Sequence, residues 1–356
     1  MKSQNRSLGS ITKVVLKGAV PLVAASLALT ACGGGGSSDD SQNKGGSSSS
    51  SPSTPPPPPT WPLTGEVDSG ATTTAEHHPV LIAKIDNTSD SEPQYGLGKA
   101  DMVTEELVEG GITRLAVFFY SDLPAKVGPI RSMRLTDIGI AKPIHARLVT
   151  SGAASVTLHG LHKAGVKYYD MENPAVVRDY NGTHDYLHSV IADLKKLGAT
   201  SAHLKNAVRP RDYMPWGSEA SYQGKKLAGS IDATFSSYRT DEWKYRGGKY
   251  VLENNYEENG DVFYPDTVIA CYVTTSMAPY KDPAGNPVPV SHFTGHGKAL
   301  IFHDGKVEKA TWVKKGEGKT VTFQTSSGAQ VKVPAGKVWL ELIPQNDGGH
   351  VTWKAH

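Results

Sequence analysis

The chain has 356 residues, and its 37 lysines and arginines nearly balance its 35 aspartates and glutamates, which leaves a formal net charge of +2. A balance so close to neutral, with no arginine-rich helix and no RNP-like aromatic block, argues against nucleic acid as the main partner. The length that remains beyond the N-terminal segments is enough for two domains with hydrophobic cores of their own.

The beginning of the chain has the pattern of an export signal. Four basic residues precede an uncharged run over residues 18–31, which is too short for a permanent membrane-spanning helix. The run ends in Leu29-Thr30-Ala31-Cys32, where small residues lead into a cysteine. We therefore expect residues 1–31 to be a lipoprotein signal peptide that is cleaved before Cys32.

The thiol of Cys32 is the expected site of lipidation. Two buried acyl chains of the palmitate type, each contributing ~0.8 kcal/mol per methylene, are sufficient for stable membrane attachment. The alternative is an ordinary secretory signal in which Cys32 follows a small residue by chance. In both cases the protein is exported, and with the lipid it is expected on the extracytoplasmic face of the cell membrane.

A low-complexity segment follows the lipidated cysteine. Residues 33–59 are mostly glycine, serine and proline, with nothing large and apolar among them. Such a composition cannot bury enough surface to fold. We expect residues 32–62 to be a disordered tether, flexible in its glycine- and serine-rich half and stiff where prolines 55–59 favour polyproline II.

Residues 63–208 alternate strand-like and helix-like patterns, which is typical of a mixed α/β domain. Short apolar runs predict strands, and apolar spacing with polar starts and glycine ends predicts helices. The expected elements are a strand over 79–85, a hairpin of 101–108 and 112–120, a helix over 136–142, a strand over 147–150, a helix from Ser155 as N-cap to Gly165, and a helix over 186–197 that ends at Gly198.

The C-terminal part has a different pattern. Short alternating runs punctuated by glycine and proline predict a mostly antiparallel β domain over residues 236–356, joined to the first domain through a connecting segment over 209–235. The expected fold class is therefore α+β. The predicted C-terminal strands cover residues 268–273, 299–302, 307–313, 320–324, 331–333 and 338–343.

Several acidic and polar residues gather around the predicted hairpin. Asp86 and Asn87 end the first predicted strand, and polar residues at a strand end often face a site. The Glu109-Gly110-Gly111 turn would fold Glu105 and its neighbour Glu106 back toward Arg114. Asp101, at the start of the hairpin, is a further candidate ligand-binding residue.

The segment Val127-Gly128-Pro129-Ile130-Arg131-Ser132-Met133-Arg134 is the most suggestive in the chain. Arginines at a strand-to-helix junction bind carboxylate or phosphate bidentately, and the helix N-terminus adds partial positive charge. We expect Arg131 and Arg134 to form an anion site, with Arg114 nearby. The alternative is an internal ion-pair network with Glu105, Glu106 and Glu109.

Other chemistry has little support in the sequence. Cys271 lies in a strand-like apolar run, which favours a buried core thiol over a nucleophile. Histidine pairs such as His184 and His188 lack the accompanying ligands of a zinc site, so we expect no metal ligation by them. The signatures of phosphate loops, dinucleotide folds and serine hydrolases are absent.

At four blocks the chain resembles the YerB-like bacterial lipoproteins, a family defined by domains of unknown function. The blocks are Ile85-Asp86-Asn87, Gly96-Leu97-Gly98-Lys99-Ala100-Asp101, Glu109-Gly110-Gly111-Ile112-Thr113-Arg114 and the arginine segment over 127–134. The likeness extends to Arg178-Asp179, to the segment from His184 to Leu187 and to a C-terminal β module, and it adds Arg178 and His184 to the candidate ligand-binding residues. It implies a surface lipoprotein with an α/β N-terminal and a β-rich C-terminal domain.

Three functions remain open at this stage. The first is binding of an anionic wall polymer or envelope protein through the arginines, and the second is a pure scaffold. The third is a metal-assisted transferase acting on a polyprenyl-diphosphate-linked glycopolymer, in which Asp86 or Asp101 would hold magnesium and the arginines the diphosphate. We place binding or a scaffold ahead of catalysis because the sequence offers no unambiguous nucleophile or base.

Overall fold

The computed structural model describes residues 58–69, 78–201 and 209–355, all within one compact unit that covers residues 56–356. The expected signal peptide, Cys32 and most of the expected tether lie outside the described residues. Within the described ranges, no helix is both long and apolar enough to cross a membrane. Trp61, near the start of the described part, already packs edge-on against Tyr120 with the ring centroids 6.0 Å apart.

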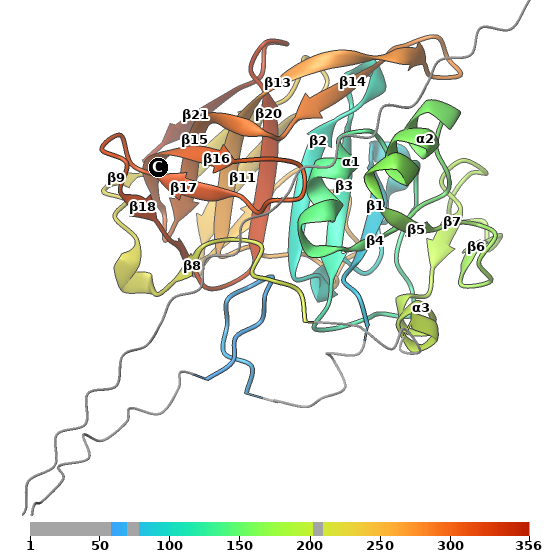
Figure 1. Cartoon of the computed structure of the whole chain (residues 1–356), viewed down its shortest axis with the longest axis horizontal. Coiled ribbons are helices and arrows are strands. Elements are labelled where there is room, and N and C mark those ends of the chain that lie inside the picture. The colour runs from blue at the N-terminus through green and yellow to red at the C-terminus, as the bar shows by residue number, and fades with distance from the viewer. Residues whose placement is uncertain (1–57, 70–77, 202–208, 356) are drawn as a thin grey trace, which may run out of the picture. The chain divides into compact units, whose positions relative to one another are not determined.

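A single thirteen-stranded sheet forms the framework (Figure 1). Eleven strands follow one another across it in the order β18 (Gln330–Val331), β17 (Thr322–Gln324), β16 (Lys306–Lys314), β15 (Gly295–His303), β13 (Thr267–Lys281), β20 (Val338–Pro344), β2 (Met102–Leu107), β3 (Thr113–Phe119), β1 (Leu81–Asn87), β4 (Arg147–Val149) and β5 (Lys167–Tyr169). Two more strands pair at its sides, β14 (Pro287–His292) with β13 and β9 (Lys226–Leu227) with β16.

Strand β20 joins the N-terminal and C-terminal strands into this one sheet. It pairs in parallel with β2 on one side and with β13 on the other. All seven of its residues are buried, as expected for a central strand that is covered on both faces. The strands of the two halves of the chain therefore share a continuous hydrogen-bonded ladder.

One face of the sheet packs against helices. α1 (Asp137–Ala141) and α2 (Ser155–Ala164) contribute Ile138, Ile140 and Leu161 to a core that includes Ile82 and Phe118 of the sheet. Because side chains alternate along a strand, the neighbours of these sheet residues point to the other face. The third α-helix among the described residues is α3 (Leu194–Ser201), and five short 3-10 helices accompany the three α-helices.

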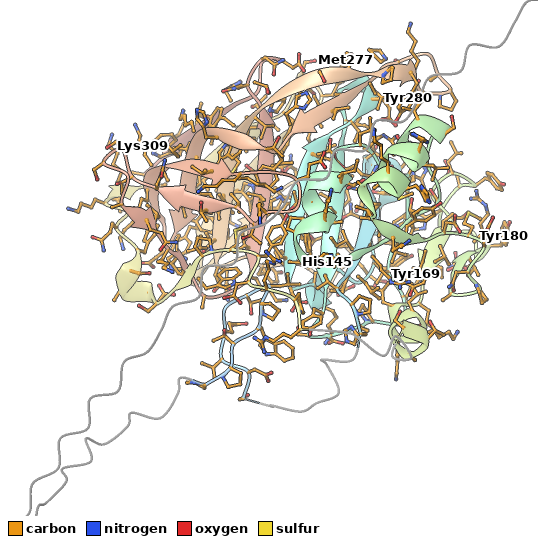
Figure 2. The ribbon with its side chains drawn as sticks, in the orientation of Figure 1. His145, Tyr169, Tyr180, Met277, Tyr280 and Lys309 are labelled. Atoms are coloured by element: carbon orange, nitrogen blue, oxygen red, sulfur yellow. The ribbon has the colours of Figure 1, made fainter. Side chains whose placement is uncertain are left out.

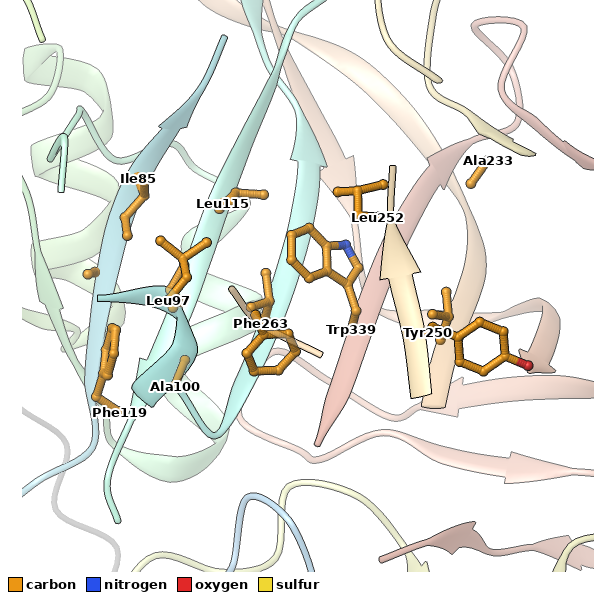
Figure 3. Close-up of a cluster of buried hydrophobic side chains, with 14 of the residues drawn as sticks. Ile85, Leu97, Ala100, Leu115, Phe119, Ala233, Tyr250, Leu252, Phe263 and Trp339 are labelled. Atoms are coloured by element: carbon orange, nitrogen blue, oxygen red, sulfur yellow. The ribbon is translucent and has the colours of Figure 1, made fainter. Parts of the chain in front are cut away.

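The other face packs against a second, four-stranded sheet. Its order is β12 (Lys249–Leu252), β11 (Thr240–Arg246), β10 (Ser230–Thr234) and β21 (His350–Lys354). Trp339 of β20 lies in this core close to Phe263, with the ring centroids 6.0 Å apart (Figure 3). Its ring centroid is also 5.2 Å from that of Trp243 of the second sheet. Two small sheets remain, β6 (Val176–Arg178) with β7 (Val190–Ala192) and β8 (Trp216–Gly217) with β19 (Val333–Pro334).

The fold is of the α+β class, with strands predominating over a few short helices. The predicted hairpin is confirmed: β2 and β3 pair antiparallel, and Glu106 lies opposite Arg114 across the ladder. Gly110 and Gly111 of the turn have φ values of 71° and 77°, a conformation that favours glycine. Cys271 is buried and unpaired, so the prediction of a core thiol is also confirmed.

The predicted helix over residues 186–197 is wrong. Residues 190–192 form β7, because the branched Val190-Ile191 pair fits the ladder with β6, and the helix begins only at Leu194. Gly198 does not end the helix, which continues to Ser201. A Cβ at position 198 would lie 2.3 Å from Leu123 Cδ1, so glycine allows close packing there. Ser155 is the first helical residue and not the N-cap, a position that Ala154 takes without a side-chain hydrogen bond.

Candidate functional site

The strand register sends the predicted polar residues to two different faces of the sheet. Asp86, Arg114 and Glu106 lie side by side across β1, β3 and β2, and their side chains share the face that α1 covers. Asn87 and Glu105 each lie one residue away along their strands, so they point to the opposite face. Asn87 and Glu105 are therefore separated from the arginines by the sheet itself.

Asp86 is the centre of the arginine cluster. Its Oδ2 lies 3.1 Å from Arg131 Nε and 3.5 Å from a terminal nitrogen of Arg114, while the Thr88 hydroxyl donates to Oδ1 over 2.6 Å. Burial alone would raise the pKa of Asp86, but Arg114, Thr88 and Arg131 lower it below its ordinary value. The carboxylate therefore stays ionised at neutral pH and holds the two guanidinium groups together.

Arg114 is a buried cation with spare hydrogen-bonding capacity. It is 1% exposed, it donates to the Ser132 carbonyl over 3.0 Å, and its Nε has no hydrogen-bond partner among the described residues. Burial lowers the pKa of Arg114 to about 10, against the opposing effect of Asp86. The group is still charged at neutral pH, and an unpaired buried donor is costly unless a ligand engages it.

Arg134 and Glu109 form a bidentate pair at the edge of the cluster. Arg134 Nε donates to Glu109 Oε2 over 2.8 Å, and a second guanidinium nitrogen contacts Oε1. The Arg134 hydrogen bonds and charge lower the pKa of Glu109 although burial acts in the opposite direction. α1 has only five residues, so the partial positive charge that we expected from a helix N-terminus has no substantial source here.

The predicted arginines surround one pocket of about 660 Å³, which we call the arginine pocket. It lies between the sheet end, the β6–β7 connection and the tip of the long β13–β14 hairpin, where Tyr280 Oη contacts Thr157 Oγ1 of α2 at 2.9 Å (Figure 2). The residues that line it are Glu109, Arg114, Arg131, Ser132, Arg134, Ser151, Gly152, Ala153, Ala154, Arg178, Leu187, Val190, Tyr280, Lys281, Asp282, Pro283 and Val288.

The arginine pocket has an excess of positive charge. Its four arginines face two carboxylates, Glu109 in the lining and Asp86 behind it. Lys281 and Asp282 of the hairpin tip offset each other. An excess of two positive charges therefore remains in a partly buried site where solvent screening is weak.

The internal ion-pair network that we considered as an alternative is only partly present. Glu109 pairs with Arg134, but Glu106 instead pairs with Lys84, whose Nζ lies 2.7 Å from both Glu106 and Asp137 of α1. Burial raises the pKa of Glu106. This triad lies outside the lining of the arginine pocket, so it neutralises none of the pocket arginines directly.

Asn87 and Glu105 belong to a separate buried cluster on the opposite face. Asn87 donates to Glu105 Oε1 and to Thr113 Oγ1, each over 2.9 Å, and Trp339 Nε1 donates to Glu105 Oε2 over 3.2 Å. Arg239 lies 3.5 Å from Glu105. All these contacts are internal, so neither Asn87 nor Glu105 is available to a ligand in the arginine pocket.

Asp101 and His184 are also remote from the arginine pocket. Asp101 accepts hydrogen bonds from the backbone nitrogens of Tyr120 and Ser121, at 2.6 and 3.1 Å, and it also accepts the Ser121 hydroxyl. His184 Nε2 contacts the Ser91 carbonyl at 3.2 Å. His188 lies between two carboxylates, with Nδ1 2.9 Å from Asp185 Oδ1 and Nε2 4.0 Å from Asp86 Oδ2.

The magnesium hypothesis finds no ligand set in the described residues. Asp86 is engaged by two arginines and Asp101 by three donors, so neither carboxylate is free for a metal ion. Across the described ranges, no three histidine, cysteine, aspartate or glutamate side chains gather as potential metal ligands.

Sequence reasoning missed the part of the pocket that the C-terminal half supplies. Tyr280 and Lys281 are about 150 residues from Arg131 in the sequence, and only the parallel pairing of β13 with β20 brings them near it. No local pattern marks such residues. The Ser151-Gly152-Ala153-Ala154 turn also lines the pocket, and its position directly after a predicted strand is a local signal that could have identified it.

Comparisons with known proteins agree with this architecture. The model "Protein of unknown function (DUF3048) N-terminal domain" matches residues 63–207, and the model of the corresponding C-terminal domain matches residues 231–340. The chain is 26% identical over 321 residues to the Bacillus subtilis (strain 168) protein called "Putative lipoprotein YerB". The aligned region covers 82% of this chain and 88% of that protein.

The crystal structure of YerB protein from Bacillus subtilis has a similar fold, with a TM-score of 0.66 at 19% identity over 82% of this chain and 99% of that chain. The two family models together match well over half of the residues. The chain therefore belongs to the DUF3048 family.

Proposed function

We propose that the protein is a lipid-anchored protein of the extracytoplasmic membrane face that binds the anionic group of an envelope ligand in the arginine pocket. The lipid anchor is supported by the cysteine at the end of the export signal and by the name of the Bacillus subtilis relative. The observation that carries the binding proposal is Arg114, a fully buried cation that lines the pocket with an unpaired Nε.

The chemistry of the pocket favours a phosphate or carboxylate. Guanidinium groups bind both bidentately, and an excess of two positive charges suits a dianion. Arg131 and Arg178 are each partly exposed. They donate hydrogen bonds to the backbone carbonyls of Leu187 and Tyr186 at the rim, so a ligand can compete for them. The lining residues come from both of the ranges that the two family models match, and ligand sites are common where two such parts of a protein meet.

A metal-assisted transferase acting on a polyprenyl-diphosphate-linked glycopolymer is the less well supported alternative. The two carboxylates expected to hold magnesium have their oxygens engaged by arginines and backbone donors. A transferase also needs magnesium ligands and a nucleophile or base beside the anion. The binding proposal needs neither.

Isothermal titration calorimetry tests the proposal on the full-length protein in detergent, with inorganic pyrophosphate as the probe. Wild type should bind saturably, and Arg131→Ala should weaken the affinity at least about tenfold, because a charge-assisted hydrogen bond is worth ~1.5–3 kcal/mol. Arg246→Ala is the matched control, since Arg246 makes only an exposed pair with Glu253. Equal affinity of Arg131→Ala and wild type would refute the site.

A further inference from the structure

We propose that the anionic ligand is a saccharide, and that one of its sugar rings stacks on Tyr186 at the rim of the arginine pocket. This inference rests on the proposed function and specifies its ligand class. The arginines would then bind the acidic group while Tyr186 binds the sugar ring that carries it.

Exposed apolar side chains are frequent in the segment that carries Tyr186. Ten large hydrophobic side chains are exposed in the part of the chain that the structure describes, and five of them fall within residues 171–187: Met171, Val177, Tyr180, Tyr186 and Leu187. Single exposed hydrophobic residues are ordinary, but a group of them indicates an interaction site. Figure 2 shows Tyr180 at the outer end of this region, pointing into solvent.

The pocket arginines hold the Tyr186 ring in a fixed position. The guanidinium carbon of Arg178 lies 3.7 Å from the ring centroid, and the same side chain donates to the Tyr186 carbonyl and, over 3.1 Å, to Ser189 Oγ. Arg131 donates to the carbonyl of Leu187 over 2.6 Å. One face of the ring is therefore packed, while Tyr186 as a whole remains 64% exposed.

This arrangement couples the aromatic surface to the anion site. Arg131 and Arg178 both line the pocket and both bind the backbone of the Tyr186-Leu187 segment. The distance from the exposed ring face to the positive charges is therefore set by two direct contacts. A ligand whose acidic group enters the pocket on this side places its next chemical group beside Tyr186 and Leu187.

Polar groups around the ring favour a sugar over a lipid. Asp185 is exposed, and the backbone nitrogen of His188 is the main cause that lowers its pKa, so it is ionised at neutral pH. Asn181 is exposed as well, held by Asp179 at 3.0 Å. An acyl chain has no hydrogen-bonding groups to offer Asp185 and Asn181, and an anionic bilayer would be repelled by the carboxylates. A pyranose offers C–H bonds to the ring and hydroxyl donors to Asp185.

Calorimetry with matched probes tests the inference on the full-length protein in detergent. The probes are inorganic phosphate, glucose 1-phosphate, N-acetylglucosamine 1-phosphate and butyl phosphate. At least one sugar phosphate should bind about five- to tenfold more tightly than inorganic phosphate and than butyl phosphate, the size of one aromatic stacking contact. Tyr186→Ala should remove this gain and leave the affinity for inorganic phosphate within about twofold.

Two further variants separate ring stacking from other effects. Tyr186→Phe keeps the ring and its packing on Arg178, so it should retain the gain. Tyr264→Ala removes an exposed tyrosine elsewhere and should change nothing. If neither sugar phosphate exceeds inorganic phosphate, or butyl phosphate gains as much, the saccharide inference is wrong while anion binding stands. If inorganic phosphate and pyrophosphate both fail to bind, the proposed function itself fails.

Discussion

Replacing Asp86 with asparagine should lower the free energy of unfolding, because the buried arginines beside it lose their counter-charge. Asp86 and Arg114 are each 1% exposed, with 3.5 Å between their charged atoms. Removing one member of a buried ion pair costs ~3–5 kcal/mol, because the remaining charge is left uncompensated. We expect a loss of about 3 kcal/mol in the free energy of unfolding, at the lower end because asparagine still accepts from Thr88.

The same substitution raises the excess positive charge of the pocket, so an anion should compensate for it. Pyrophosphate should therefore stabilise Asp86→Asn more than it stabilises wild type. Combining Asp86→Asn with Arg114→Met removes both charges and should recover part of the lost stability.

Urea unfolding of the full-length protein in detergent, followed by tryptophan fluorescence, measures these differences, since Trp243 and Trp339 are buried in the core. Glu253→Gln is the control: it breaks an exposed pair and should cost less than ~1 kcal/mol. A loss for Asp86→Asn as small as that of the control would refute the reasoning, as would equal stabilisation of mutant and wild type by pyrophosphate.

Three other predictions concern buried groups. Lys84→Met should destabilise the fold by ~3–5 kcal/mol in urea unfolding, because Glu106 and Asp137 lose their shared cation; a near-neutral effect would contradict the triad. Burial raises the pKa of Glu257 to about 8, so the folded state holds a proton that the unfolded state releases, and stability should fall from about pH 4.5 to 8 by up to ~1.4 kcal/mol per pH unit. Glu257→Gln should remove that part of the pH dependence, and an unchanged profile would argue against it. Burial also raises the pKa of the Cys271 thiol, so iodoacetamide should modify it only after unfolding, and rapid modification of the native protein would contradict its burial.

The strands and the hairpin could be predicted because their signals are local. The apolar run before Asp86 and the paired glycines at 110 and 111 each contain the information for their own conformation. The helix predicted over 186–197 failed because apolar spacing there fits a helix, while pairing with β6 favours a strand for Val190. That pairing is tertiary, and the branched Val190-Ile191 pair is its one local sign in the sequence.

The candidate site was predictable in part for the same reason. Arg131 and Arg134 are close in sequence, so their proximity follows from short-range structure. Arg114 joins them because β1 pairs with β3 on one side and bridges to Ile130 on the other. The split between Asp86 and Asn87 follows from the alternation of a strand, but which of the two faces the arginines depends on where α1 packs. The contribution of Tyr280 depends on the order of strands in the sheet, which the sequence patterns do not specify.

The most direct test of the account is to locate a bound anion in a crystal of the full-length protein. Tungstate, a phosphate-like dianion with strong anomalous scattering, is a suitable probe. The account predicts an anomalous peak within hydrogen-bond distance of Arg114 and Arg131, lost in Arg131→Ala crystals. Tungstate bound only at other sites, or an arginine pocket without a peak at saturating tungstate, would contradict it.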